Sequence, residues 1–187
     1  MKRRNSSIAL LALASIAALT AVASAELIIG DGSDNRLVGT RGADVIKGLG
    51  GKDSIRGRAG HDKLVGGPGD DKARGREDGL RGGRGDDLMR GGGGSDELYG
   101  NQGDDLMSGN EGFDGLIGGP DADTLEGGPG GDVLHGGPGR DFVRGWDPSR
   151  GPNRPQVDFI SCGPGFDRAQ VDPSDQVARN CEDVEMP

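Results

Sequence analysis

Aspartate recurs with a nearly constant spacing through the middle of the chain. From Asp44 onward the interval is nine residues, except for one interval of seven between Asp71 and Asp78. Ca²⁺ takes roughly six to eight hard oxygen ligands, which in proteins are carboxylates and backbone carbonyls. A single aspartate would be an ordinary turn former, whereas a long series at one phase predicts a repeated cation site. The series consists of Asp44, Asp53, Asp62, Asp71, Asp78, Asp87, Asp96, Asp105, Asp114, Asp123, Asp132 and Asp141.

These aspartates occupy position six of a short repeated unit. Residues 30–144 divide into thirteen units, of which twelve have nine residues and one, residues 75–81, has seven. Every unit begins with glycine, and every unit has an apolar or small residue two positions after the aspartate position. These residues are Leu37, Ile46, Ile55, Leu64, Ala73, Leu80, Met89, Leu98, Met107, Leu116, Leu125, Leu134 and Val143. Such a constant phase is not expected of a disordered glycine-rich tail.

Each unit predicts a turn followed by a short strand. The first six positions are rich in glycine, and several units carry proline at position three, which excludes a helix. The last three positions place one apolar side chain between two mostly polar ones, which is the alternation of a half-buried strand. A fixed short period of this kind predicts a solenoid, in which each unit stacks on its neighbours and repeats the same oxygen-rich turn.

The units resemble the haemolysin-type calcium-binding (RTX) repeat of secreted bacterial proteins. That repeat has the pattern GGxGxDxUx with U aliphatic, and units such as GGRGDDLMR and GGPGRDFVR match it closely. The resemblance implies that two consecutive units form one turn of a parallel β-roll, with calcium bound between the turns of units n and n+2. It implies that the candidate metal ligands are Asp53, Asp71, Asp87, Asp105, Asp123 and Asp141 on one edge of the roll, and Asp44, Asp62, Asp78, Asp96, Asp114 and Asp132 on the other.

The expected fold class is therefore all-β. It is a parallel β-roll, an RTX-type solenoid with short strands and glycine-rich calcium-binding turns, to which a small disulfide-tied C-terminal cap is added. Because each unit buries about one aliphatic side chain, burial alone does not offset the entropy lost on ordering nine residues. We therefore expect a largely disordered chain without calcium and a folded chain with several bound Ca²⁺ ions, so that binding and folding are one event.

Some units depart from the pattern. Asn35 replaces the aspartate of the first unit and contributes no charge. The shortened unit at 75–81 lacks two turn residues, so we expect impaired sites around Asp62, Asp78 and Asp96. Asp121 replaces the glycine at position four of its unit, where a positive φ is expected to be needed.

The segment before the repeats predicts export. Three basic residues, Lys2, Arg3 and Arg4, precede an apolar run that ends in Ala-Ser-Ala at residues 23–25. This pattern is typical of a cleaved secretory signal peptide over residues 1–25, and the apolar run is too short for a membrane span. The mature chain is accordingly expected to be extracellular.

The remaining boundaries follow from breaks in the period. Residues 26–145 are expected to form the roll. Residues 146–155 predict a loop, whose Trp146 is expected to cover the apolar end of the roll. Residues 156–187 predict a cap of degenerate repeats, because Asp158, Asp167 and Asp175 return at the repeat phase. Its two cysteines, Cys162 and Cys181, predict one disulfide, as is usual in an exported chain.

The acidic composition narrows the choice of partner. The chain carries 31 Asp and Glu against 22 Lys and Arg, a formal net charge of −9. This excess argues against nucleic acid or an anionic membrane as the main partner of the chain, and it favours cations as partners. The ninth positions nevertheless predict a basic ladder of Arg56, Arg74, Arg90 and Arg144, with Lys72 beside it. That ladder is interpreted either as a solubilising outer surface or as a surface for a polyanion such as a cell-wall polymer.

The sequence favours a binding protein over an enzyme. It contains no HExxH metalloprotease motif and no GxSxG nucleophile elbow. We expect a secreted calcium-binding repeat protein that acts as a non-catalytic structural or adhesive module. The alternatives are a calcium-dependent accessory domain of an extracellular hydrolase and a protein that binds a polyanion or the cell surface.

Overall fold

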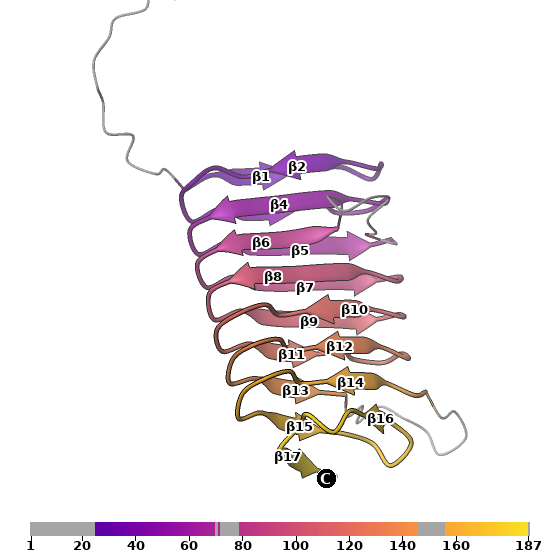
Figure 1. The fold of residues 1–187 in the computed structure, drawn as a ribbon. Helices are drawn as coiled ribbons and strands as arrows, with labels where there is room; N and C mark the ends of the chain where they lie inside the picture. The colour runs from indigo at the N-terminus through magenta and orange to yellow at the C-terminus, as the bar shows by residue number, and fades with distance from the viewer. Residues whose placement is uncertain (1–24, 70, 72–78, 146–155, 187) are drawn as a thin grey trace, which may run out of the picture.

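The computed structural model describes residues 25–69, 71, 79–145 and 156–186 (Figure 1). Within these residues the regular structure consists of seventeen short β-strands. No helix with the length and apolar character needed to cross a membrane occurs in this part of the chain. Residues 1–24 of the predicted signal peptide and the predicted loop at 146–155, with Trp146, lie outside the described residues.

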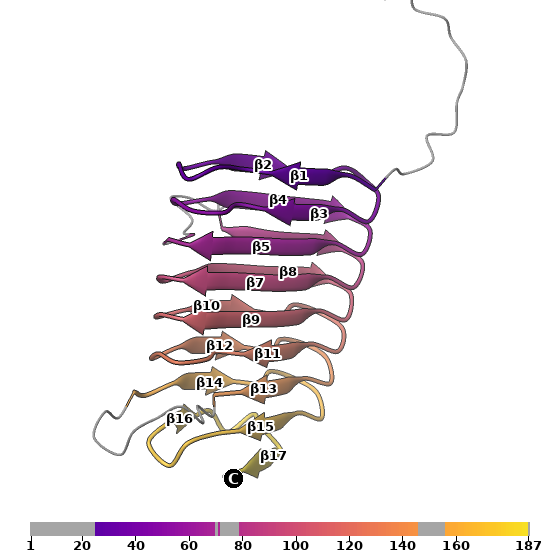
Figure 2. The ribbon, with the colours of Figure 1, turned by 180° about the vertical axis from the view of Figure 1, so that it is seen from behind.

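Successive strands alternate between two parallel sheets, which we call the odd sheet and the even sheet after their strand numbers. The odd sheet contains β1 (Leu27–Ile29), β3 (Val45–Lys47), β5 (Lys63–Pro68), β7 (Leu88–Gly93), β9 (Leu106–Glu111), β11 (Thr124–Glu126), β13 (Phe142–Arg144), β15 (Arg168–Gln170) and β17 (Asp183–Glu185). The even sheet contains β2 (Arg36–Val38), β4 (Ser54–Ala59), β6 (Leu80–Arg84), β8 (Glu97–Gln102), β10 (Gly115–Ile117), β12 (Val133–His135), β14 (Phe159–Ser161) and β16 (Gln176–Val177). The two sheets form the two layers of one column, and their strands run in opposite directions (Figures 1 and 2). The predicted parallel roll is confirmed.

One inward-facing side chain per strand builds a narrow core between the sheets. In β11, for example, Leu125 is buried while its neighbours Thr124 and Glu126 are not. The strands pair in register, so that Leu64 lies opposite Met89 and Leu116 opposite Leu134. The core positions predicted from the sequence are fully buried from Ile46 to Val143, except for Ala73, which lies outside the described residues. Leu37 is only partly buried because it lies near the open end of the stack.

The shortened unit at 75–81 does not form a separate half-turn. β4 pairs with β6 and β5 pairs with β7, so one connection joins Pro68 to Leu80. Without residues 72–78, the segment from 66 to 81 would read GGPGDDGLR, which is a regular unit. The sequence is therefore better described as one nonapeptide that carries a seven-residue insertion, and the roll continues past it.

This insertion makes the predicted basic ladder wrong. Arg56 lies in the even sheet, whereas Arg90 and Arg144 lie in the odd sheet; Lys72 and Arg74 lie outside the described residues. The face on which a side chain lies depends on the number of half-turns before it. Counting the insertion as a half-turn assigned every later unit to the opposite sheet.

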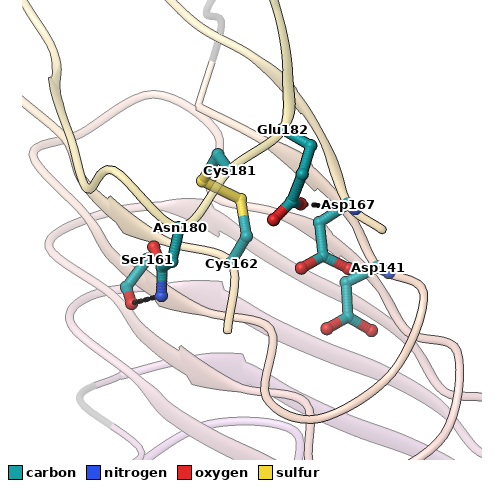
Figure 3. The surroundings of a disulfide bond; sticks show 7 residues. All are labelled: Asp141, Ser161, Cys162, Asp167, Asn180, Cys181 and Glu182. Atoms are coloured by element: carbon teal, nitrogen blue, oxygen red, sulfur yellow. Dashed lines mark hydrogen bonds between the residues drawn. A yellow bond between two sulfur atoms is a disulfide. The ribbon is translucent and has the colours of Figure 1, made fainter. Parts of the chain in front are cut away.

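The C-terminal segment continues both sheets. β14 pairs with β12 and β16 with β14, while β15 pairs with β13 and β17 with β15. The predicted disulfide between Cys162 and Cys181 is present, with 5.1 Å between the two Cα atoms, and Figure 3 shows it beside the last turns. Asn180 Nδ2 also donates a hydrogen bond of 3.1 Å to Ser161 Oγ. Units whose sequence departs from the repeat pattern thus still contribute paired strands to the two sheets of the roll.

Candidate metal centre

The aspartates that precede the strands form two ladders, one along each edge of the roll. In each ladder the backbone N–H of one aspartate donates to Oδ1 of the aspartate in the next turn, as from Asp44 to Asp62 at 2.7 Å. The odd ladder precedes the odd strands and contains Asp44, Asp62, Asp87, Asp105, Asp123, Asp141 and Asp167. The even ladder precedes the even strands and contains Asp53, Asp71, Asp96, Asp114, Asp132, Asp158 and Asp175.

The pairing predicted from the sequence is wrong beyond Asp71. Asp62 donates to Asp87 at 2.7 Å and Asp71 donates to Asp96 at 2.8 Å, whereas Asp78 had been placed between Asp62 and Asp96. The cause is again the insertion at 72–78, which adds residues without adding a half-turn. Asp78 lies outside the described residues, and both ladders are continuous without it.

The ladder carboxylates are withdrawn from water. Those from Asp44 to Asp141 are at most 3 % exposed. The second carboxylate oxygen, Oδ2, is buried without a hydrogen-bond partner at positions in both ladders, among them Asp53, Asp62, Asp87, Asp105, Asp123, Asp141 and Asp167. Burying a charged oxygen without a partner costs free energy, and buried polar atoms of native proteins are almost always satisfied. A positive charge is therefore the expected neighbour of these oxygens.

Burial also raises the pKa values of these carboxyl groups. Desolvation is the main cause in each case, and it raises the pKa to about 7 for Asp87, about 6 for Asp105, about 8 for Asp123 and about 6 for Asp141. Neighbouring carboxylates of the same ladder raise these values further, while the backbone N–H donors lower them. The charged form is thus unfavourable here near neutral pH unless a cation compensates it.

The glycine at position one of each unit makes room for the carboxylate. A Cβ on Gly39 would lie 2.5 Å from Asp44 Oδ2 and 2.6 Å from the carbonyl oxygen of Gly57. Any side chain at this position would therefore displace both the carboxylate and the backbone of the next turn. This close approach explains why glycine occupies position one throughout the series.

At position four, backbone and side-chain oxygens from two stacked turns face the same small space. A Cβ on Gly139 would lie 3.1 Å from Asp141 Oδ1 and would collide with the carbonyl oxygen of Asp121, in the turn before. On the even edge, a Cβ on Gly130 would lie 3.0 Å from Asp132 Oδ1 and would collide with the carbonyl oxygen of Gly112. Carbonyl and carboxylate oxygens are the ligands that Ca²⁺ takes.

A cation in these turns would need the backbone. Among the described residues, no three Asp, Glu, His or Cys side chains form a group that could hold a metal ion by themselves. Each ladder supplies one carboxylate per turn, so the carbonyl oxygens of the glycine-rich turns would have to complete the shell. This donor set, rich in hard oxygens and free of sulfur and imidazole, fits calcium rather than zinc.

Two conformational requirements accompany the site. Asp121, at position four, has φ of 89°, which confirms the positive φ expected there. Position two also takes positive φ, as at Leu49 (84°), Arg58 (94°) and Asn101 (81°), and this was not predicted. A signal was available, because most units have glycine or asparagine at position two, and these residues tolerate positive φ best.

The ladders also extend beyond the candidate ligands. Asp141 donates to Asp167 Oδ1 at 2.8 Å, and Asp167 donates to Glu182 Oε2 at 2.9 Å (Figure 3). The repeat phase of Asp167 was visible in the sequence, but its place in the ladder was not predicted. At the other end, Asn35 occupies a ladder position and donates to Asp53 Oδ1 at 2.9 Å.

Comparison with known proteins agrees with this geometry. The family model described as the RTX calcium-binding nonapeptide repeat matches residues 29–64, 38–73, 57–78, 81–116 and 117–147, which together span more than half of the chain. Its matches are interrupted between residues 78 and 81, directly after the insertion. A search of the curated proteins finds no match. The repeated glycine-rich turns, the parallel roll and the family match lead to one conclusion: the chain belongs to the family of RTX calcium-binding nonapeptide repeat proteins.

Proposed function

We propose that this chain is a secreted calcium-binding β-roll that folds when it binds Ca²⁺ and has no catalytic role. The observation that carries the proposal is the run of buried carboxylates along the odd ladder. From Asp62 through Asp87 to Asp141, these groups have an unpartnered buried oxygen and raised pKa values. Calcium bound in the turns would compensate this charge.

The proposed ligands come from both ladders. Each ion would take the aspartate carboxylates of two stacked turns together with carbonyl oxygens at the glycine-rich positions. The proposed carboxylate ligands are Asp44, Asp53, Asp62, Asp71, Asp87, Asp96, Asp105, Asp114, Asp123, Asp132 and Asp141. Calcium would supply positive charge and link one turn to the next, since its ligands belong to both.

The architecture supports a coupling of binding to folding. The core is one side chain deep on each strand, and central strands such as β7 and β9 have six residues. Without cations, each added turn brings another buried carboxylate next to the previous one. Ions that bind only the stacked turns stabilise the folded state, and this stabilisation grows with the logarithm of the ratio of ion concentration to dissociation constant.

A structural or adhesive role outside the cell is the proposed biological use. Export is inferred from the signal-peptide pattern at residues 1–25, and a disulfide such as Cys162–Cys181 is typical of exported proteins. Millimolar extracellular calcium would then fill the sites on exit, so that the ion acts as a folding signal.

Far-ultraviolet circular dichroism and Trp146 fluorescence test the proposal on the chain from Glu26 onward. Calcium, then chelator, is added at neutral pH, with magnesium as the control because it demands a smaller octahedral shell. We expect a cooperative, reversible transition from coil to β-structure with calcium and none with magnesium. A chain that is already β-rich in chelator, or unordered at millimolar calcium, would contradict the proposal.

A further inference from the structure

The connection from β14 to β15, residues 162–167, has the geometry of the turns inside the roll, although it lies beyond the residues that the family model matches. Within the roll, the backbone N–H of Asp121 donates to the carbonyl oxygen of Pro138 at 3.0 Å. One turn later, Gly139 donates to Pro164 in the same way, also at 3.0 Å. Residues 162–167 therefore form the last repeat turn of the odd ladder.

The last repeat turn presents the same oxygens as the candidate metal turns. A Cβ on Gly165 would lie 2.9 Å from Asp167 Oδ1 and would collide with the carbonyl oxygen of Gly139. Asp167 is fully buried, and its Oδ2 has no hydrogen-bond partner. Among the carboxylates of the described residues 156–186, this is the one buried oxygen without such a partner. A cation bound in this turn would supply the missing charge.

The turn that follows on the same ladder lacks these features. Residues 178–182, which we call the terminal turn, lie between β16 and β17, and they number five residues without a glycine. Glu182 is exposed, and its Oε2 accepts the hydrogen bond from Asp167 N–H at 2.9 Å (Figure 3). The glycines that bring carbonyl oxygens close to a ladder carboxylate are missing here, so we expect no cation beyond Asp167.

The disulfide occupies the place that the following turn has elsewhere. Cys162 is at position one, where the earlier turns of the odd ladder have glycine. A Cβ on Gly136, which is position one of the turn before, would lie 2.5 Å from both Asp141 Oδ2 and the carbonyl oxygen of Cys162. At Cys162 the side chain is present, and it is bonded to Cys181 of the terminal turn (Figure 3). A covalent bond thus joins two turns where close-packed backbone joins the earlier ones.

We propose that the Cys162–Cys181 disulfide holds the last repeat turn as a calcium site, so that reduction of the disulfide releases the ion bound by Asp167. The carbonyl oxygen of Gly139 and the turn that ends at Asp141 would complete the ligands. Without the sulfur–sulfur bond, the last repeat turn loses its covalent link to the terminal turn, and a more flexible turn loses more conformational entropy when it binds a cation. The inference rests on the calcium-bound roll of the proposed function and adds a redox condition to one site.

Thermodynamic linkage makes this coupling reciprocal. If the disulfide raises the affinity of the site for calcium, calcium makes the disulfide harder to reduce by the same factor. Reduction by a dithiol such as dithiothreitol transfers two electrons and two protons, which gives the thiols of Cys162 and Cys181 while the dithiol closes to a cyclic disulfide. Calcium and oxidising conditions occur together outside the cell, where the site would be complete.

Native mass spectrometry of the chain from Glu26 onward tests the inference by counting bound ions at a free calcium concentration that just saturates the chain. We expect one ion fewer after treatment with dithiothreitol. Asp167→Asn should also bind one ion fewer with its disulfide intact, because it lacks the charge of the last ladder carboxylate. The matched control is Asp183→Asn, which removes an exposed carboxylate outside the ladder and should leave the count unchanged.

Equal ion counts for the oxidised and the reduced chain would overturn the inference. Equal counts for Asp167→Asn and the unaltered chain would do the same, because Asp167 would then hold no ion. Loss of every ion on reduction would also overturn it, since the disulfide would then support the whole roll and not the last site.

The equilibrium between dithiothreitol and the disulfide at constant free calcium is the second readout. In Asp167→Asn the disulfide should be half reduced at a ratio of reduced to oxidised dithiothreitol roughly tenfold lower than in the unaltered chain. Asp123→Asn, a change in the middle of the same ladder, should shift this ratio much less. Equal shifts in the two variants would show that the disulfide responds to the stability of the whole roll, and the inference would fail.

Circular dichroism of the same samples separates this inference from the proposed function. A calcium-induced transition to β-structure together with equal ion counts would leave the proposed function standing and overturn the inference. A chain that is already β-rich in chelator would contradict calcium-coupled folding, whereas loss of one ion on reduction would still support the redox-dependent site.

Discussion

The two edges of the roll differ in their regularity. At the odd edge, where even strands lead into odd strands, the central residues of successive strands are nine positions apart at each connection from Leu37–Ile46 to Ile160–Ala169. At the even edge the spacing rises to 16 from Leu64 to Leu80 and to 17 from Val143 to Ile160. Both long connections thus lead from an odd strand into an even strand, from β5 to β6 and from β13 to β14.

Three turns of the odd edge carry an acid outside the ladder. Outside the odd ladder, Asp104 donates through its backbone N–H to Asp86 Oδ1 at 3.0 Å, and Gly103 donates to Asp121 Oδ2 at 3.2 Å. Asp86, Asp104 and Asp121 all raise the pKa of the ladder carboxyl of Asp105, after the larger effect of its burial. Three neighbouring odd-edge turns thus bring outer acids close to the ladder carboxyl of Asp105.

The difference indicates how a solenoid can combine a strict site with tolerance of insertions. A strand keeps its place as long as it pairs with the strands above and below, whatever the length of the chain that leads into it. A carboxylate ladder with compensating cations instead needs every turn to present its oxygens in the same way. We therefore expect the odd edge to dominate the dependence on calcium and the even edge to accept changes.

The largest effect should come from pH when calcium is removed. The folded pKa values of Asp87, Asp105, Asp123 and Asp141 are raised to about 6 to 8 from an ordinary value of 3.8, so the folded state binds more protons than the unfolded state. The resulting stabilisation is fully present below about pH 4 and is lost as the pH rises through 6 to 8. In chelator, β-structure should increase on acidification, as followed by circular dichroism. A chain that stays equally unordered at both pH values would show that the odd ladder does not limit folding.

The second largest effect should come from replacing the glycine at position one of an odd-edge turn with alanine, which adds one methyl group. In Gly100→Ala the new Cβ would meet Asp105 Oδ2 and the carbonyl oxygen of Gly118, the latter at 2.7 Å. We expect the calcium-loaded chain to lose roughly 1–3 kcal/mol or more in chemical denaturation. The control is Gly93→Ala, because no atom lies within 4 Å of its Cβ. Equal losses in the two variants would mean that the close approach at position one is not limiting.

Neutralising one carboxylate on each edge should have a smaller, unequal effect. Asp123→Asn removes a carboxyl group whose pKa is raised to about 8, so it should stabilise the calcium-free chain at neutral pH. It should also raise the calcium concentration at the folding midpoint severalfold, since a charged ligand is lost. Asp132→Asn is the matched change on the even edge and should shift both quantities less. Identical shifts would remove the distinction between the edges.

The smallest effect should come from deletion of residues 72–78 at the even edge. The deletion leaves the regular unit GGPGDDGLR, and shortening one connection in this way changes the closure entropy by less than about 1 kcal/mol. The calcium concentration at the folding midpoint and the denaturant concentration at the unfolding midpoint should therefore change little. Transfer of the same seven residues into the odd-edge turn before Asp105 is the informative contrast, and we expect it to weaken the calcium response clearly. A harmless transfer would show that both edges tolerate insertions.

Much of the fold could be predicted from the sequence because its information is local and repeated. The buried positions from Ile46 to Val143, the strand after each turn and the pairing of Cys162 with Cys181 follow from spacing and residue type. The burial of Asp44 and Asp141 also agrees with their place in the repeat. The partners of Asp62 and Asp71 could not be predicted in this way, because they depend on the number of half-turns that intervene.

The sequence by itself determined the repeating unit, a solenoid of turns and short strands, its core and the oxygen-rich chemistry of its turns, since periodicity and glycine content constrain each unit in the same manner; the parallel roll followed from the resemblance to the RTX repeat. Only the tertiary structure decided which turns stack on one another. It showed that residues 72–78 are an insertion, that Arg56 and Arg81 are neighbours in the even sheet, and that Asp123 faces Asp105 and Asp141 with an unpartnered oxygen. These relations join residues 18 or 25 positions apart, and pairing between strands fixes them, which no local pattern encodes.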